Sequence, residues 1–214
     1  MPSPTRHIFD ANTLRNFALV GALDHLPALV DGDLCIGRVV REELKQGARV
    51  FPQRNFHRLD DPNWATYVTR FQGLDAKLNQ LRFTTLEVTS ASPREGEFAF
   101  LTCLHNEEVM EDGEAESFTL AAYRDLVLYS DEYKVYREGD NFNAHDFPCP
   151  YHGNELPEYD ITVHSTAWLL LKGVERGVFA EDTAEDYYLA MRDIWPRHPK
   201  KTLVELADGD GKYW

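Results

Sequence analysis

Short apolar runs alternate with amphipathic helical segments along this 214-residue chain, and the alternation limits the folds open to it. The apolar run 7–9 precedes a helical segment that begins near Leu14. The run 34–36 precedes a second helical segment, which we expect to end at Gly47 because glycine often follows the last turn of a helix. Strands that alternate with helices form mostly parallel sheets covered on both faces. The sequence therefore predicts an α/β fold, a three-layer α/β/α sandwich with a mostly parallel central sheet.

The rest of the chain continues this pattern. Apolar residues recur every three or four positions over 62–81, which predicts the clearest amphipathic helix of the chain. We expect residues 1–180 to form one domain, with residues 181–214 as a C-terminal helix and tail packed on the same domain. The remaining predicted elements are strands at 83–88, 126–129 and 161–163, helices at 98–104, 113–123, 168–174 and 184–195, and a long polar loop at 139–159.

Several features predict a cytoplasmic protein. No stretch approaches the roughly 20 apolar residues of a membrane span, so we expect no membrane association. The first residues lack the apolar run and cleavage site of a signal peptide. Cys35, Cys103 and Cys149 are odd in number and lack framework spacing, which favours reduced thiols.

The charge balance restricts the partners. The chain has 36 acidic and 22 basic residues and a formal net charge of −14, which repels polyanions at long range. A tight, unaided nucleic-acid binder is therefore not expected. A metal ion that neutralises an acidic cluster, or a basic partner, would reduce this repulsion.

Acidic residues follow the predicted strands. Asp10 ends the first strand and Asp131 follows the strand at 126–129, so a parallel sheet places both carboxylates at one edge. Glu43 and Glu114 lie in helices from which their side chains can turn toward that edge. Such acids repel one another unless a divalent ion joins them, although each acid alone is more often a helix cap or a surface group. Oxygen ligands favour Mg²⁺ or Mn²⁺, ions that assist phosphodiester hydrolysis.

Five short segments carry a family resemblance. They are Ile-Phe-Asp-Ala-Asn-Thr-Leu-Arg-Asn-Phe-Ala at 8–18, Val-Val-Arg-Glu-Glu-Leu at 39–44, Gly-Glu-Ala-Glu at 113–116 with Leu-Ala-Ala at 120–122, Leu-Tyr-Ser-Asp-Glu at 128–132 and Val-His-Ser-Thr at 163–166. In order and spacing they resemble PIN-domain proteins, especially the VapC-type toxins and their relatives. The resemblance extends over most of residues 6–179.

The resemblance implies a metal-dependent ribonuclease that uses Mg²⁺ or Mn²⁺. It implies an RNA substrate, and the chain would be the toxin of a toxin–antitoxin pair. The net charge of −14 predicts in addition that a basic, antitoxin-like protein partner or a homodimer groove supplies phosphate contacts. The doubled acids Glu42/Glu43, Glu114/Glu116 and Asp131/Glu132 leave the choice of ligands open. The implied catalytic and metal-ligating residues are Asp10, Glu43, Glu114 and Asp131, and the implied supporting residues are Asn12, Ser165 and Thr166.

Two other interpretations start from the same residues. The segment 9–14 also resembles the nucleophile motif of haloacid-dehalogenase-type phosphatases, in which Asp10 would attack phosphorus. Those enzymes need an acid two residues later to protonate the leaving group, and Asn12 cannot do this. The third interpretation is a PIN-like fold that serves as a non-catalytic binding module, because fold does not determine function.

Overall fold

The computed structural model describes residues 5–54, 61–92, 94–106, 110–131, 161–194 and 201–207. The predicted loop 139–159 lies outside these residues. The elements are β1 (Arg6–Phe9), α1 (Ala11–Val20), the 3₁₀ helix η1 (Leu23–His25), α2 (Leu26–Leu29), β2 (Asp33–Gly37), α3 (Arg38–Arg54), α4 (Trp64–Gln72), α5 (Leu74–Gln80), β3 (Thr84–Leu86), α6 (Glu97–Asn106), α7 (Asp112–Arg124), β4 (Val127–Tyr129), β5 (Val163–His164), α9 (Thr166–Glu175), α10 (Glu181–Ile194) and α11 (Leu203–Ala207).

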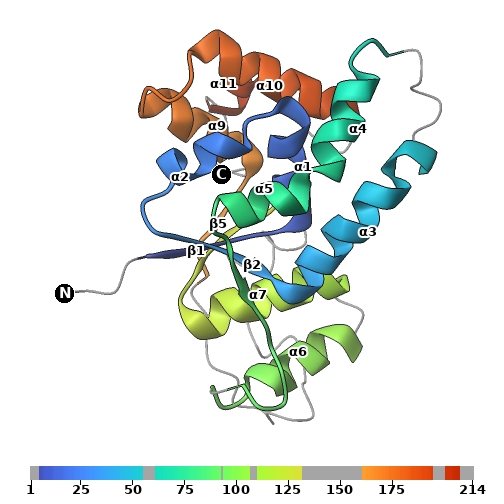
Figure 1. Ribbon diagram of the computed structural model, residues 1–214. Coiled ribbons are helices and arrows are strands. Elements are labelled where there is room, and N and C mark those ends of the chain that lie inside the picture. The colour runs from blue at the N-terminus through green and yellow to red at the C-terminus, as the bar shows by residue number, and fades with distance from the viewer. Residues whose placement is uncertain are drawn as a thin grey trace.

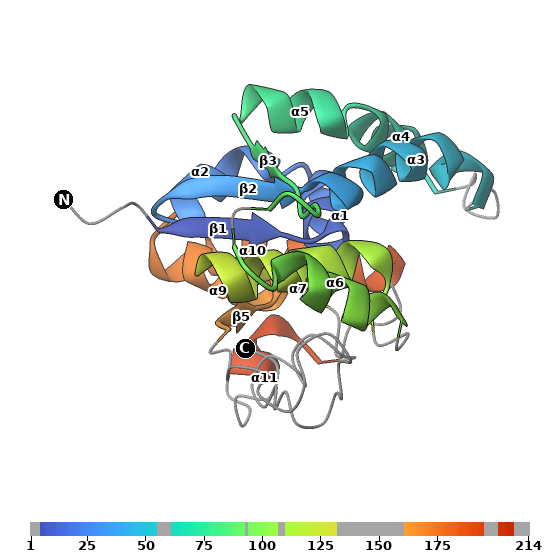
Figure 2. The same cartoon turned by 90° about the horizontal axis from the view of Figure 1, so that it is seen from below.

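The described strands form one sheet in the order β3-β2-β1-β4-β5, and every neighbouring pair is parallel. Figure 2 shows β3, β2, β1 and β5 in this order across the molecule, with β1 and β2 pointing toward the starts of α1 and α3. Because every strand is parallel, all the carboxyl ends lie at one edge of the sheet. The predicted α/β/α sandwich is confirmed.

The core lies on both faces of the sheet because successive side chains of a strand point to opposite sides. Phe9 and Tyr129 pack on one face with α1, α9 and α10, whereas Ile8 and Leu128 pack on the other with α6 and α7. Figure 1 shows α6 and α7 below the sheet and α1, α2, α9, α10 and α11 above it. Both faces are therefore covered, as parallel sheets require.

Two predicted helix boundaries were wrong. Helix α3 does not end at Gly47 but continues to Arg54, although an interior glycine costs a helix ~1 kcal/mol relative to alanine. Gly47 faces α1, where an added Cβ atom would lie 3.3 Å from Nη2 of Arg15. The predicted helix over 62–81 divides into α4 and α5 at Gly73, whose ψ of −5° departs from helical geometry.

The C-terminal segment contains one more helix than the sequence pattern indicated. Helix α11 starts at a capping box, in which the Glu205 backbone N–H donates to the Thr202 hydroxyl at 3.1 Å and the Thr202 N–H donates to the Glu205 carboxylate at 2.7 Å. Leu203 and Leu206 are buried in the same core as Phe9. Residues of α10 and α11 thus pack on the main core, and Thr-x-x-Glu at 202–205 was the signal for this helix.

Among the described residues, no helix combines the length and apolar composition that crossing a bilayer requires.

The state of the cysteines differs in part from the prediction. Cys35 is a buried free thiol, as expected. Cys103 is disulfide-bonded, which differs from the reduced state expected for all three cysteines.

Candidate functional site

Asp10 is buried directly after β1, where it caps α1. Its Oδ1 accepts the Thr13 backbone N–H at 2.7 Å, and its Oδ2 accepts the Ser130 hydroxyl at 2.5 Å. Burial, reinforced by the negative charge of Asp131, raises the pKa of Asp10 to about 7. Keeping the carboxylate of Asp10 charged in the folded protein therefore costs free energy. A solvent-exposed helix cap does not have this cost.

Asp131 follows β4 and is oriented by three donors. The Thr166 backbone N–H donates to Oδ1 at 2.8 Å, while the Asn16 amide at 2.8 Å and the Thr166 hydroxyl both donate to Oδ2. Ser165 has a different role: its hydroxyl caps α9 by accepting the Trp168 N–H at 3.0 Å. Thr166 therefore contacts a predicted acid directly, and Ser165 shapes the turn that places Thr166.

The topology of the sheet brings the two aspartates together. The chain moves outward from β1 through β2 to β3, and then returns to place β4 on the other side of β1. At such a reversal the connections leave in opposite directions and open a crevice beyond the carboxyl ends of the two strands. Asp10 and Asp131 stand at that position, since Phe9 and Tyr129 are paired neighbours in β1 and β4.

Glu43 lies on α3 and faces the start of α7. Its Oε1 accepts the Gly113 backbone N–H at 3.1 Å, and a Cβ atom added at Gly113 would lie 2.5 Å from that oxygen. Burial raises the pKa of Glu43, and the positive charge of Arg15 opposes this shift. Arg15 also donates to Asn12 Oδ1 at 3.4 Å, so Asn12, Arg15 and Glu43 line the junction of α1, α3 and α7.

The doubled acids have different surroundings. Glu114 belongs to a capping box at the start of α7 and accepts the Glu111 N–H at 3.3 Å. Glu116 is only 1% exposed and accepts the Val39 N–H at 2.7 Å, at the start of α3. Burial raises the pKa of Glu116 to about 7. Glu42 is exposed and pairs with Lys45 at 2.9 Å, while Glu132 lies outside the described residues.

The contact between Glu116 and Gly37 gives a first prediction. A Cβ atom at Gly37 would lie 2.4 Å from Glu116 Oε2, and Val39 holds that carboxylate in place. Gly37→Ala is expected to lower the free energy of unfolding by ~2 kcal/mol through overpacking. Urea denaturation measures this. Gly73→Ala is the control, since its Cβ atom would lie 3.4 Å from the nearest atom. Equal stability of the two variants would contradict the prediction.

The donor atoms fit a hard divalent cation. Among the described ranges, no group of three or more His, Cys, Asp and Glu side chains lies close enough to hold a metal ion. Asp131 nevertheless lies close enough to Asp10 for its charge to raise the pKa of Asp10. Mg²⁺ is commonly bound by one or two carboxylates together with waters and substrate phosphates. A cation there would also stabilise the buried charge of Asp10. Glu43 and Glu114 lie nearer the start of α7, with partners of their own.

Three residues of this region were not predicted from the sequence. Ser130 and Asn16 donate to the two aspartates, and Arg15 lies beside Glu43. Asn16 is 2% exposed on a helix whose buried positions are mainly apolar, and a buried polar residue in such a pattern is a usable signal. Ser130 directly follows β4 and offered a second signal.

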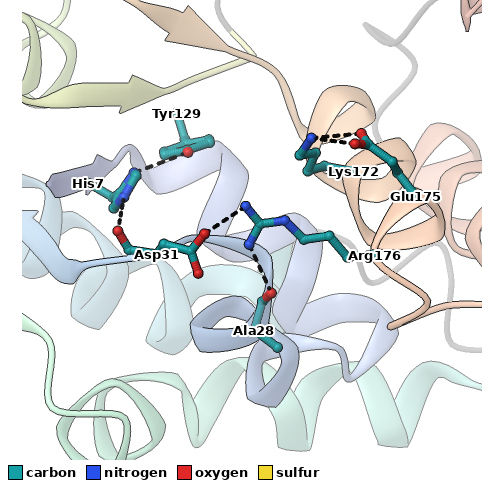
Figure 3. Close-up of polar contacts among 7 residues, drawn as sticks. All are labelled: His7, Ala28, Asp31, Tyr129, Lys172, Glu175 and Arg176. Carbon is teal, nitrogen blue, oxygen red and sulfur yellow. Dashed lines mark hydrogen bonds and ion pairs between the residues drawn. The ribbon is translucent and has the colours of Figure 1, made fainter.

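A second polar cluster lies at the amino ends of β1 and β2 (Figure 3). His7 Nε2 lies 3.4 Å from the Asp31 carbonyl oxygen, so Nε2 carries the ring proton and Nδ1 accepts the Tyr129 hydroxyl at 3.2 Å. Burial lowers the pKa of His7, consistent with this neutral ring. Arg176 donates to Asp31 at 3.0 Å and to the Ala28 carbonyl at 3.3 Å. These contacts fasten the end of α9 to the segment before β2, which is a structural role.

Comparisons of the chain with models of protein families, with curated proteins and with solved structures found no match. The acidic pair and its surroundings are therefore the basis for assigning a function.

Proposed function

We propose that this protein is a Mg²⁺- or Mn²⁺-dependent endoribonuclease that hydrolyses phosphodiester bonds of RNA. One observation carries the proposal: Asp10 and Asp131 meet beyond the carboxyl ends of β1 and β4, where the order of the sheet reverses. Ligand sites of open parallel sheets lie at this position. A buried carboxylate with a strongly raised pKa beside a second carboxylate is also typical of functional sites.

In this proposal Asp10 and Asp131 hold the cation. Thr13 and Ser130 orient the carboxylate of Asp10, and Thr166 and Asn16 orient that of Asp131. A bound Mg²⁺ or Mn²⁺ supplies a Lewis acid that stabilises charge on the phosphate and activates water. Glu43 and Glu114 are proposed as further acids, at the junction of α3 and α7.

The choice of reaction and substrate has separate support. Asn12 stands where a haloacid-dehalogenase-type phosphatase needs an acid, and an amide does not protonate a leaving group. Its side chain accepts a hydrogen bond from Arg15 instead. The preference for RNA comes from the resemblance of most of residues 6–179 to PIN-domain ribonucleases. That resemblance also supports the proposal that the chain is a toxin-like member of the family.

The proposal also includes a partner that offsets the negative charge of the chain, and a cellular location. With a net charge of −14 the chain needs help to approach RNA, and a basic, antitoxin-like partner or a second copy of the chain would supply phosphate contacts. We place the protein in the cytoplasm, where RNA substrates occur. In this proposal the disulfide at Cys103 is transient, as disulfides of cytosolic proteins usually are.

The direct test measures cleavage of a structured RNA by the full-length protein in Mg²⁺, in Mn²⁺ and in EDTA. We expect cleavage with either metal and none in EDTA. p-Nitrophenyl phosphate is the comparison substrate, and we expect no turnover of it. Metal-dependent hydrolysis of p-nitrophenyl phosphate without RNA cleavage would favour the phosphatase interpretation. RNA binding without cleavage in either metal would favour the binding module.

A further inference from the structure

Arg15 brings positive charge to the acidic region described above. The residue lies on α1, five positions after the helix-capping Asp10, and its Nη1 donates to Asn12 Oδ1 at 3.4 Å. Since Asn12 is in the first turn of α1, this contact directs the guanidinium back toward the start of the helix. The start of α1 is the end nearest the carboxyl edge of the sheet.

Helix α3 is shaped to accept this guanidinium. Gly47 stands in the middle of a 17-residue helix, and a Cβ atom there would lie 3.3 Å from Arg15 Nη2. Most side chains at position 47 would therefore displace Arg15. Gly47 weakens α3 but leaves room for the guanidinium of Arg15. This suggests that the position of Arg15 is important for the function of the protein.

The positive charge of Arg15 lies among acidic side chains and offsets part of their repulsion toward an anionic ligand. Its charge acts on Glu43, which Glu111 and Asp112 also approach, and Glu43 accepts the Gly113 N–H. A phosphate of RNA has the same charge as a carboxylate and takes the same forked hydrogen bonds from a guanidinium. Arg15 can therefore bind a phosphate of RNA by the charge-assisted hydrogen bonds that a guanidinium also forms with carboxylates.

We infer that Arg15 is a phosphate-binding residue for RNA, whose guanidinium contacts a backbone phosphate of the bound strand. The inference rests on the proposed ribonuclease function and names a residue that contacts its substrate. Gly47 is the residue that makes room for this contact. In a chain with a net charge of −14, a cation placed beside the acids would supply phosphate binding where repulsion is strongest.

The test measures binding of a fluorescein-labelled RNA oligonucleotide in Mg²⁺ by fluorescence anisotropy over a range of salt concentrations. All proteins are full-length and carry Asp10→Asn, which keeps the RNA intact. We expect Arg15→Gln to weaken binding about tenfold, the loss of one charge-assisted contact. The slope of log affinity against log salt should fall by ~0.7, the value for one phosphate on a single strand. Arg15→Lys should lie between, since it keeps the charge but not the fork.

Two further variants separate binding from structure. Arg49→Gln removes the same charge from an exposed position of α3, and we expect its affinity to stay within about twofold of the parent. Gly47→Ala should raise Tm by about 2–4 °C, because it improves the helix, yet weaken RNA binding about threefold by displacing Arg15. Opposite movements of Tm and affinity are not expected if Arg15 serves structure alone.

The outcomes distinguish this inference from the function on which it rests. If Arg15→Gln matches Arg49→Gln in affinity and salt slope while the wild-type protein cleaves RNA, the phosphate contact is wrong and the ribonuclease function stands. If the wild-type protein does not cleave RNA but binding depends on Arg15 as expected, the phosphate site stands and the ribonuclease function is wrong. A parent protein that binds no RNA overturns the phosphate contact, and cleavage of RNA by the wild-type protein then decides the ribonuclease function.

Discussion

Asp10→Asn and Asp131→Asn will each reduce metal-dependent RNA cleavage by about 100-fold or more, with the protein still folded. Each substitution removes a proposed metal ligand, and the charge stabilisation supplied by a catalytic cation amounts to several kcal/mol. In Asp10→Asn the new side chain can keep both local contacts, since its oxygen can accept the Thr13 N–H and its amide can donate to Ser130. Asp186→Asn on the exposed side of α10 is the control and should cleave RNA normally.

Stability is expected to change in the opposite direction in Asp10→Asn. The pKa of Asp10 is about 7 in the folded protein and has an ordinary value of 3.8, so between these values the folded state binds a proton that the unfolded state has released. The wild-type free energy of unfolding therefore falls as pH rises from about 4 to about 7. Asp10→Asn does not lose stability in this way. Its free energy of unfolding relative to wild type therefore increases between about pH 4 and pH 7 and is largest above pH 7.

Urea unfolding in EDTA at pH 5 and pH 8 measures this difference. At pH 8 we expect Asp10→Asn to be more stable than wild type by ~1–3 kcal/mol, and at pH 5 by much less. His164 has the opposite effect on the stability of the wild-type protein. Burial lowers the pKa of His164 to about 4, so the stability that it contributes is lost as pH falls below 6.5. The comparison with the variant removes this background. Unchanged cleavage in both aspartate variants, or an advantage independent of pH, would contradict the assignment.

Arg124→Met should be the most destabilising substitution considered, with a loss of ~3–5 kcal/mol in the free energy of unfolding. The side chain of Glu97 is 0% exposed, and its two oxygens accept Nε of Arg124 at 2.6 Å and Nη2 at 2.9 Å. Removal of the arginine leaves a buried carboxylate without its cation. Arg124 also donates to the Glu87 carbonyl at 2.9 Å, so a bond between α7 and the segment after β3 is lost as well.

A double-mutant cycle tests the mechanism of this loss. Glu97→Gln combined with Arg124→Met removes the uncompensated charge, and we expect it to recover part of the stability lost in the single variant. Lys45→Met breaks an exposed ion pair with Glu42 and should cost less than ~1 kcal/mol. Chemical denaturation of wild type, Arg124→Met, Glu97→Gln, the double variant and Lys45→Met measures these differences. A double variant less stable than Arg124→Met would show that the buried charge is not the cause.

The sequence predicted the parts of the site that depend on neighbouring residues. The apolar run 7–9 predicted a strand in a sheet covered on both faces, and Asp10 directly after it had to lie at the carboxyl edge. The position of Asp131 followed in the same way from β4. Local pattern was sufficient for these two residues because a strand fixes the direction of the residue that follows it.

The remaining contacts depend on distances along the chain that pattern does not encode. Residues 114 and 116 differ by about 200° around a helix, so only the rotation of α7 decides that Glu116 is buried against α3 while Glu114 stays in a capping box. The hydrogen bonds from Asn16 and Thr166 to Asp131 join segments 115 and 35 residues apart. They exist only once β4 pairs with both β1 and β5.

The pairing of β1 has a consequence for the timing of folding. β1 can pair with β2 soon after residues 33–37 are synthesised, but Ser130 contacts Asp10 only once the chain extends 120 residues beyond Asp10. Long-range contacts of this kind form late, because a large loop must close before they give any stabilisation. A nascent chain that ends before β4 therefore carries Asp10 without its partner. The proposed nuclease site would therefore be complete only after most of the chain has left the exit tunnel of the ribosome.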